Sequence, residues 1–88
     1  MTLKIERSEH RGFTIFSLTG RLDIEHIPEL ERLFGARTHY GKVIVDLKEL
    51  RFADRDAVMF LSGCEMAGLK LKNCPAYIRE WMEREKST

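Results

Sequence analysis

The 88-residue chain has few of the residues that mark specialised protein classes: two cysteines, two prolines and six glycines. Cys64 and Cys74 form no CxxC pair and the N-terminus lacks the apolar core of a secretory signal, so we expect reduced thiols. No segment approaches the ~20 apolar residues that span a bilayer. The scarcity of proline and glycine excludes collagen-like and low-complexity chains. We expect one cytoplasmic domain, residues 1–88, with no direct membrane insertion.

The chain also lacks an excess of charge of either sign, because 15 basic residues stand against 14 acidic ones. Proteins that bind polyanions usually carry a long-range positive field. No run of lysine and arginine in this sequence supplies one locally. We therefore expect no nucleic-acid partner.

Familiar catalytic and cofactor motifs are missing as well. The sequence has no GxGxxG, GxxxxGK[ST], GxSxG or HExxH pattern, so nothing local indicates a nucleotide cradle, a nucleophile elbow or a zinc-peptidase site. His10, His26 and His39 are scattered without the spacing of metal ligands. Cys64 is expected on a buried helix face, where a thiol behaves as a small hydrophobe. We predict no enzyme, no metal and no cofactor.

Apolar periodicity predicts four strands. The segment LKIER alternates apolar and charged residues, as a half-buried strand does. FTIFSL, residues 13–18, is apolar on both faces, which indicates a central strand joined to the first by a hairpin. KVIVDL is rich in β-branched residues and reads as a buried strand. LKLKNC alternates again, and its outward lysines are typical of a protected edge strand.

Helical spacing predicts three helices between and after these strands. The first begins near Ile24, has Pro28 in its first turn and ends at Gly35. The second follows Asp54 and ends at Gly68, and the third begins at Pro75. Strands separated by helices require right-handed crossovers and a mostly parallel sheet. The predicted fold class is therefore α/β, with a small, mixed, mostly parallel sheet of four strands in the order β-β-α-β-α-β-α.

Three charged residues open the second helix. Asp54 at the N-cap would accept a hydrogen bond from a free backbone N–H, a contribution of ~1 kcal/mol. Asp56 in the first turn would interact favourably with the helix dipole. Capping alone explains both carboxylates. Together with Arg55 they also suit a docking point for a partner protein or a site for a small ligand. A small-ligand site requires a concave polar pocket at this turn.

The second helix carries a further indication. If Ala57, Leu61, Cys64 and Gly68 face the sheet, four other residues should turn partly outward. These are Val58, Met59, Ser62 and Met66. Flexible methionines are favoured at adaptable protein-binding surfaces. The alternative is that the third helix covers these residues.

The runs FSLTGRLDIEHIPELERLF, VIVDLKELRFADRDAVMFL and CPAYIREWM together resemble a STAS domain, the fold shared by sulphate transporters and bacterial anti-sigma factor antagonists. In typical antagonists the last motif of the second run reads Asp-Ser-Ser-Gly-Leu, and a partner kinase that is also the anti-sigma factor phosphorylates the second serine. Asp54 matches the aspartate, Arg55 and Asp56 stand where the serines would be, and Ala57 replaces the glycine. The resemblance implies the scaffold without the phosphorylatable hydroxyl.

The resemblance implies a non-catalytic domain of transcription regulation that binds a protein partner. That partner is an anti-sigma factor of the kinase type. Alternatively, the chain is an accessory subunit of a membrane transport ATPase, which is then its partner. The candidate partner-binding residues are Asp23, Asp54, Arg55, Asp56, Val58, Met59, Ser62 and Met66. Asp56 is the equivalent of the phosphorylation site, and Asp23 is included because the GRLD turn lies near this surface in the family fold.

Chain length is the other departure from the family. Typical members continue past the third helix with a further strand and helix, whereas this chain ends at Thr88, which implies a C-terminally truncated sheet. An incomplete sheet leaves an edge that a partner or a second copy would cover. A homodimer is therefore a further possibility.

Overall fold

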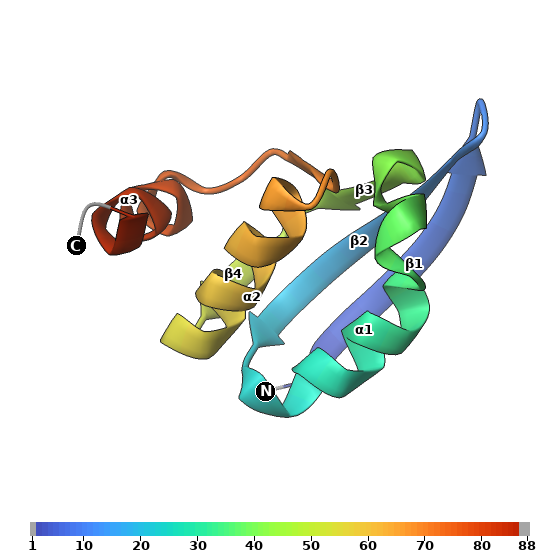
Figure 1. Ribbon diagram of the computed structural model, residues 1–88. Coiled ribbons are helices and arrows are strands. Elements are labelled where there is room, and N and C mark those ends of the chain that lie inside the picture. Colours follow the sequence, from blue (N-terminus) through green and yellow to red (C-terminus); the bar gives the residue numbers. More distant parts are fainter. Residues whose placement is uncertain (1, 87–88) are drawn as a thin grey trace.

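A computed structural model describes residues 2–86 of the chain (Figure 1). The strands are β1 (Leu3–His10), β2 (Phe13–Leu22), β3 (Val43–Asp46), β4 (Leu50–Ala53) and β5 (Lys70–Lys72). The helices are α1 (Ile27–Phe34), α2 (Arg55–Met66) and α3 (Ala76–Lys86), with short 3₁₀ segments η1 (Ile24–His26) and η2 (Arg37–Lys42). The predicted α/β class is confirmed.

Strand β2 is central, as its two apolar faces predict. It pairs antiparallel with β1 through a two-residue turn at Arg11 and Gly12, both of which have the positive φ that hairpin turns of this length favour. On its other side β2 pairs parallel with β3 and, further along, with β4. Strand β5 pairs parallel with β3 and ends the sheet, so its predicted edge position is confirmed.

The four-strand prediction was wrong, because β4 makes the sheet five-stranded. This strand is only four residues long. Its burial does not alternate: Leu50 and Ala53 are buried, whereas Arg51 and Phe52 between them are exposed. The register with β2 shifts between Gly20 and Arg21, so β4 follows an irregularity instead of a regular pleat. A period-two search therefore finds no strand there.

Helices α1 and α2 cover one face of the sheet, and α3 lies beside α2 (Figure 1). Alternate residues of β2, including Phe16, Leu18 and Leu22, point into this layer and are fully buried. Phe34 of α1 joins the two helices to the sheet, with its ring 5.4 Å from that of Phe16 and stacked 6.1 Å from that of Phe60. The core that positions the start of α2 thus lies between the sheet and these two helices.

Helix α2 is buried on a second side as well, where it meets α3. Arg55, Val58, Ser62 and Glu65 follow the three- and four-residue spacing of a single helix face. Arg55 donates a 2.9 Å hydrogen bond to Glu85 of α3, and Glu65 accepts 2.8 and 3.1 Å hydrogen bonds from α3. Val58 and Ser62 lie between these two ion pairs.

Three features of α2 correct the sequence-based expectation. Val58 is fully buried and Ser62 is 4% exposed, so their predicted outward position was wrong and the alternative, that the third helix covers them, is confirmed for these two residues. The reason is that α3 supplies a second neighbour, with Ile78 and Met82 buried on it. The helix also ends at Met66, two residues before the predicted stop at Gly68. Cys64 is buried as predicted, and both cysteines are free.

Candidate protein-interaction site

Asp54 joins the start of α2 to the turn that follows β2. Its Oδ1 accepts a 2.9 Å hydrogen bond from the backbone N–H of Ala57, which confirms the predicted N-cap. Its Oδ2 accepts a 3.2 Å hydrogen bond from the backbone N–H of Ile24. Its own N–H donates to the carbonyl oxygen of Leu22 at 3.2 Å. Both carboxylate oxygens are therefore used inside the domain, and Asp54 acts as a structural link.

Asp23 has a similar structural use. Its Oδ1 accepts a 3.0 Å hydrogen bond from the N–H of Glu25, and its own N–H donates to Nδ1 of His26 at 3.2 Å. This reciprocal cap opens η1. The bond between Asp54 and Ile24 brings the Asp23 turn beside the start of α2, as the resemblance implies. The half-buried Asp23 side chain also lies 3.8 Å from Arg21.

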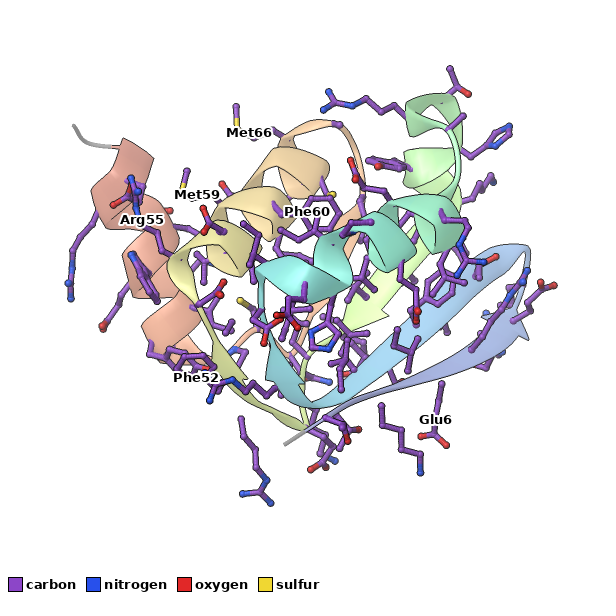
Figure 2. All side chains as sticks on the ribbon, turned by 90° about the horizontal axis from the view of Figure 1, so that it is seen from below. Glu6, Phe52, Arg55, Met59, Phe60 and Met66 are labelled. Atoms are coloured by element: carbon purple, nitrogen blue, oxygen red, sulfur yellow. The ribbon has the colours of Figure 1, made fainter. Side chains whose placement is uncertain are left out.

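Arg55 points toward α3 (Figure 2). Its guanidinium lies 2.9 Å from the Glu85 carboxylate, and this hydrogen bond raises the pKa of Arg55 further above its usual value. Arg55 is therefore engaged in the α2–α3 contact. The Arg55 side chain is still 66% exposed, and it borders the other residues that α2 leaves exposed.

Those exposed residues form a single line along α2. Asp56, Met59, Gly63 and Met66 recur at intervals of three and four residues, so they share one helix face; we call them the α2 stripe. Met59 is 39% exposed and Met66 is 76% exposed. The Asp56 side chain is exposed, and within residues 2–86 its carboxylate makes no hydrogen bond or ion pair. Figure 2 shows Met59 and Met66 pointing away from the sheet.

Ile24 is a further exposed apolar residue beside the start of α2, and the sequence pattern did not point to it. It is 55% exposed, although its backbone N–H is bound to Asp54 at the start of α2. The sequence pattern placed the beginning of a helix near Ile24 and gave this residue no role in a binding surface. The signal that would have found it is its place directly after Asp23 in the GRLD turn. The resulting surface combines exposed apolar side chains with one fixed carboxylate.

The site offers no enclosed space for a small molecule. Within residues 2–86 no pocket is found at the Asp54–Asp56 turn or elsewhere. The same residues contain no group of three His, Cys, Asp or Glu side chains arranged to hold a metal ion. In the described part of the chain, no helix is both long and apolar enough to cross a membrane. In the described residues this surface is therefore open and not enclosed.

Comparison by sequence finds no matching protein family and no matching curated protein. Comparison by structure finds several similar folds. An anti-sigma factor antagonist from Mycobacterium paratuberculosis has a TM-score of 0.68 at 18% identity, over 98% of this chain and 80% of that one. The anti-sigma factor antagonist SpoIIAA in its unphosphorylated form has a TM-score of 0.60 at 18% identity, over 90% and 79%.

A third similar structure is the STAS domain of an antisigma-factor antagonist from Rhodobacter sphaeroides. It has a TM-score of 0.57 at 15% identity, over 82% of this chain and 85% of that one. At these identities the likeness concerns the fold. It agrees with the resemblance that the sequence motifs indicate over nearly the whole chain. The chain therefore has the fold of the STAS domain of anti-sigma factor antagonists.

Proposed function

We propose that this chain is a non-catalytic, cytoplasmic regulatory domain that docks a protein partner through the α2 stripe and the neighbouring Ile24. The observation that carries this proposal is a contrast at the start of α2. The carboxylates of Asp23 and Asp54 are engaged within the domain, whereas the exposed Asp56 carboxylate makes no hydrogen bond or ion pair within residues 2–86 and lies beside two exposed methionines. Exposed apolar side chains that lie together beside polar residues are typical of an interaction site.

The chemistry of the stripe fits a partner with an apolar patch beside a cation. Fully burying a methionine side chain contributes about 1.5–3 kcal/mol, and Met66 has most of its side chain left to bury. Methionine adapts to irregular partner surfaces because its side chain is unbranched and polarizable. The Asp56 carboxylate adds direction, since a complementary cation fixes how the partner is oriented.

The resemblance gives Asp56 a specific meaning. It stands at the position where typical antagonists carry the phosphorylated serine. A carboxylate supplies about one negative charge, against about −1.5 to −2 for a phosphoserine, and it has no hydroxyl to modify. We infer that the surface is permanently charged and that phosphorylation at residue 56 does not regulate it.

Arg55 has a different role in this proposal from the one that the sequence suggested. Its ion pair with Glu85 holds the end of α3 against the start of α2. With Glu65 and Arg79, it fixes α3 over Val58 and Ser62. Burial removes Val58 and Ser62 from the proposed interaction surface. Its contact residues are then Ile24, Asp56, Met59 and Met66, and the exposed Arg55 lies at its border.

The leading candidate for the partner is an anti-sigma factor of the kinase type, since the similar structures are anti-sigma factor antagonists. Affinity purification of the tagged chain from its own cells, followed by mass spectrometry, tests this. The wild type and a Glu49→Lys control should retain the same protein, and Asp56→Lys should lose it. Glu49 is an exposed acid of the turn between β3 and β4, so its reversal makes the same change of net charge as Asp56→Lys.

The identity of the retained protein separates the alternatives. A transport ATPase would identify an accessory subunit, and recovery of a differently tagged copy of the chain itself would identify a homodimer. Equal retention of a partner by Asp56→Lys and by the wild type would reject the proposed surface. Thermal unfolding of each variant shows whether a loss of binding is a loss of fold.

A further inference from the structure

The second face of the sheet is uncovered in the described part of the chain. Figure 2 shows the helices on one side of the sheet, with Glu6 pointing away on the other side. Phe13, Ile15 and Ile44 lie on this second side and are only half-buried. Ile15 and Ile44 are paired across β2 and β3, so these apolar residues form one central patch. We call this side the open sheet face.

Three lysines stand at the border of this patch. The ammonium groups of Lys42 and Lys70 lie 5.3 and 5.2 Å from the ring centroid of Phe13. Lys72 follows Lys70 by two residues on β5 and therefore points to the same face. All three are exposed, and none forms an ion pair within residues 2–86. The fold thus assembles a basic cluster that is not visible in the sequence.

The two acidic residues of the open sheet face offset its positive charge only in part. Glu6 lies 3.9 Å from Lys4, its neighbour on β1. Asp46 uses Oδ1 to accept hydrogen bonds from the Asn73 side chain at 3.1 Å and from the Lys48 N–H at 2.9 Å. Asp46 is also the register partner of Lys72, and its carboxylate stays charged because both donors are neutral. The face keeps a net positive charge, since its lysines, Lys4, Lys42, Lys70 and Lys72, outnumber these two carboxylates.

We propose that the open sheet face is an electrostatic docking surface for a membrane that displays anionic lipid headgroups. Lysines near such a membrane are attracted by its negative surface potential. The described chain has no pocket for a compact ligand, whereas an extended layer of headgroups needs none. Single-stranded nucleic acid is less suited, because base stacking needs free aromatic rings. Phe13 is already covered by lysines, and Phe52 by Arg21 at 4.2 Å.

This surface is separate from the proposed partner site. Figure 2 shows Met59 and Met66 on the side of the molecule opposite to Glu6. A domain docked through the open sheet face would therefore hold the α2 stripe away from the membrane. Membrane docking and partner binding are compatible in this arrangement. The experiment for one surface does not depend on the outcome of the experiment for the other.

The test is co-sedimentation of the full chain with vesicles of equal parts phosphatidylglycerol and phosphatidylcholine in 0.1 M salt. The test variant combines Lys42→Gln, Lys70→Gln and Lys72→Gln. The control variant combines Arg32→Gln, Arg37→Gln and Arg84→Gln, exposed residues off this face that remove the same charge. One lysine contributes about a fivefold change in partition, so the test variant should lose about one-hundredfold. The control should lose less than about fivefold.

Each result decides the proposal once circular dichroism has shown that both variants are folded. Selective loss by the test variant, together with release of the wild type in 0.5 M salt, supports it. Absence of wild-type binding, equal losses by both variants, or equal binding to pure phosphatidylcholine overturns it. So does tighter wild-type binding to a single-stranded oligouridine than to the vesicles, if the test variant loses that binding.

Discussion

Replacing Asp54 by alanine tests the link between α2 and the turn after β2. The carboxylate accepts one hydrogen bond from Ala57 within the helix and another from Ile24 in the turn. Losing an N-cap costs about 1 kcal/mol. Losing the acceptor for Ile24 costs about another 1 kcal/mol, less than for a fully buried charged bond because this contact is exposed. The expected decrease in the free energy of unfolding is therefore about 2 kcal/mol.

Urea unfolding followed by circular dichroism measures this decrease. With a slope of about 1 kcal/mol per molar urea for a small domain, the midpoint should fall by about 2 M. The melting temperature should fall by about 8–16 °C. Asp54→Asn provides the matched control. Its carbonyl oxygen keeps the bond to Ala57, while its amide group leaves Ile24 without an equivalent acceptor, so we expect about half the loss.

Two results would refute the reasoning behind these numbers. An alanine variant within 0.5 kcal/mol of the wild type would mean that neither hydrogen bond stabilises the domain appreciably. An asparagine variant as unstable as the alanine variant would mean that the cap to Ala57 is not the part that matters. In either case Asp54 would again be a candidate interaction residue. The distinction between a structural Asp54 and an interacting Asp56 would then no longer hold.

Three further predictions concern burial and backbone geometry. Met82→Ala should lower the free energy of unfolding by about 2–5 kcal/mol because Met82 is fully buried, whereas Met59→Ala should change it by less than about 0.5 kcal/mol; similar losses in urea unfolding would contradict the assigned faces. Gly63→Ala should stabilise α2 by about 0.5–1 kcal/mol, since its added Cβ meets nothing within 4 Å. Gly20→Ala should destabilise the domain, because its Cβ would lie 2.5 Å from the Thr2 carbonyl oxygen at a φ of +100°; thermal unfolding that ranks the two glycine variants the other way would reject this. Burial raises the pKa of the Cys64 thiol, so the unfolded chain releases this proton first as the pH rises above the ordinary value of about 8.5. The free energy of unfolding should then decline above that pH, and urea unfolding from pH 8 to 10 should show a smaller decline for Cys64→Ala; an equal decline would remove Cys64 as a cause.

Local rules predicted the elements whose signals are local. The period-two pattern of β1 and β2, the early proline of α1 and the cap at Asp54 each depend on neighbours in sequence, and the structure confirms them. Strand β4 was missed for the same reason. Its four residues lie opposite a register shift in β2, and only the paired strand reveals the irregularity.

Long-range contacts account for the errors in the candidate site. Helical spacing assigned α2 one buried side, but α3 packs on a second side and buries Val58 and Ser62. The second hydrogen bond of Asp54 joins residues 30 positions apart, and so does the ion pair of Arg55. The residue types at positions 54 and 55 do not indicate which distant residues they contact. The exposed methionines and Asp56 could be proposed from sequence because they needed no partner to be placed correctly.

The central claim is that the α2 stripe is the surface by which this domain binds its partner. Calorimetric titration of the copurified partner against the Met59→Ala/Met66→Ala double variant tests it most directly, because truncating these exposed side chains should leave the fold stable. We predict an affinity at least about tenfold lower than that of the wild type, with the Glu49→Lys control unchanged. Wild-type affinity in the double variant would contradict the claim.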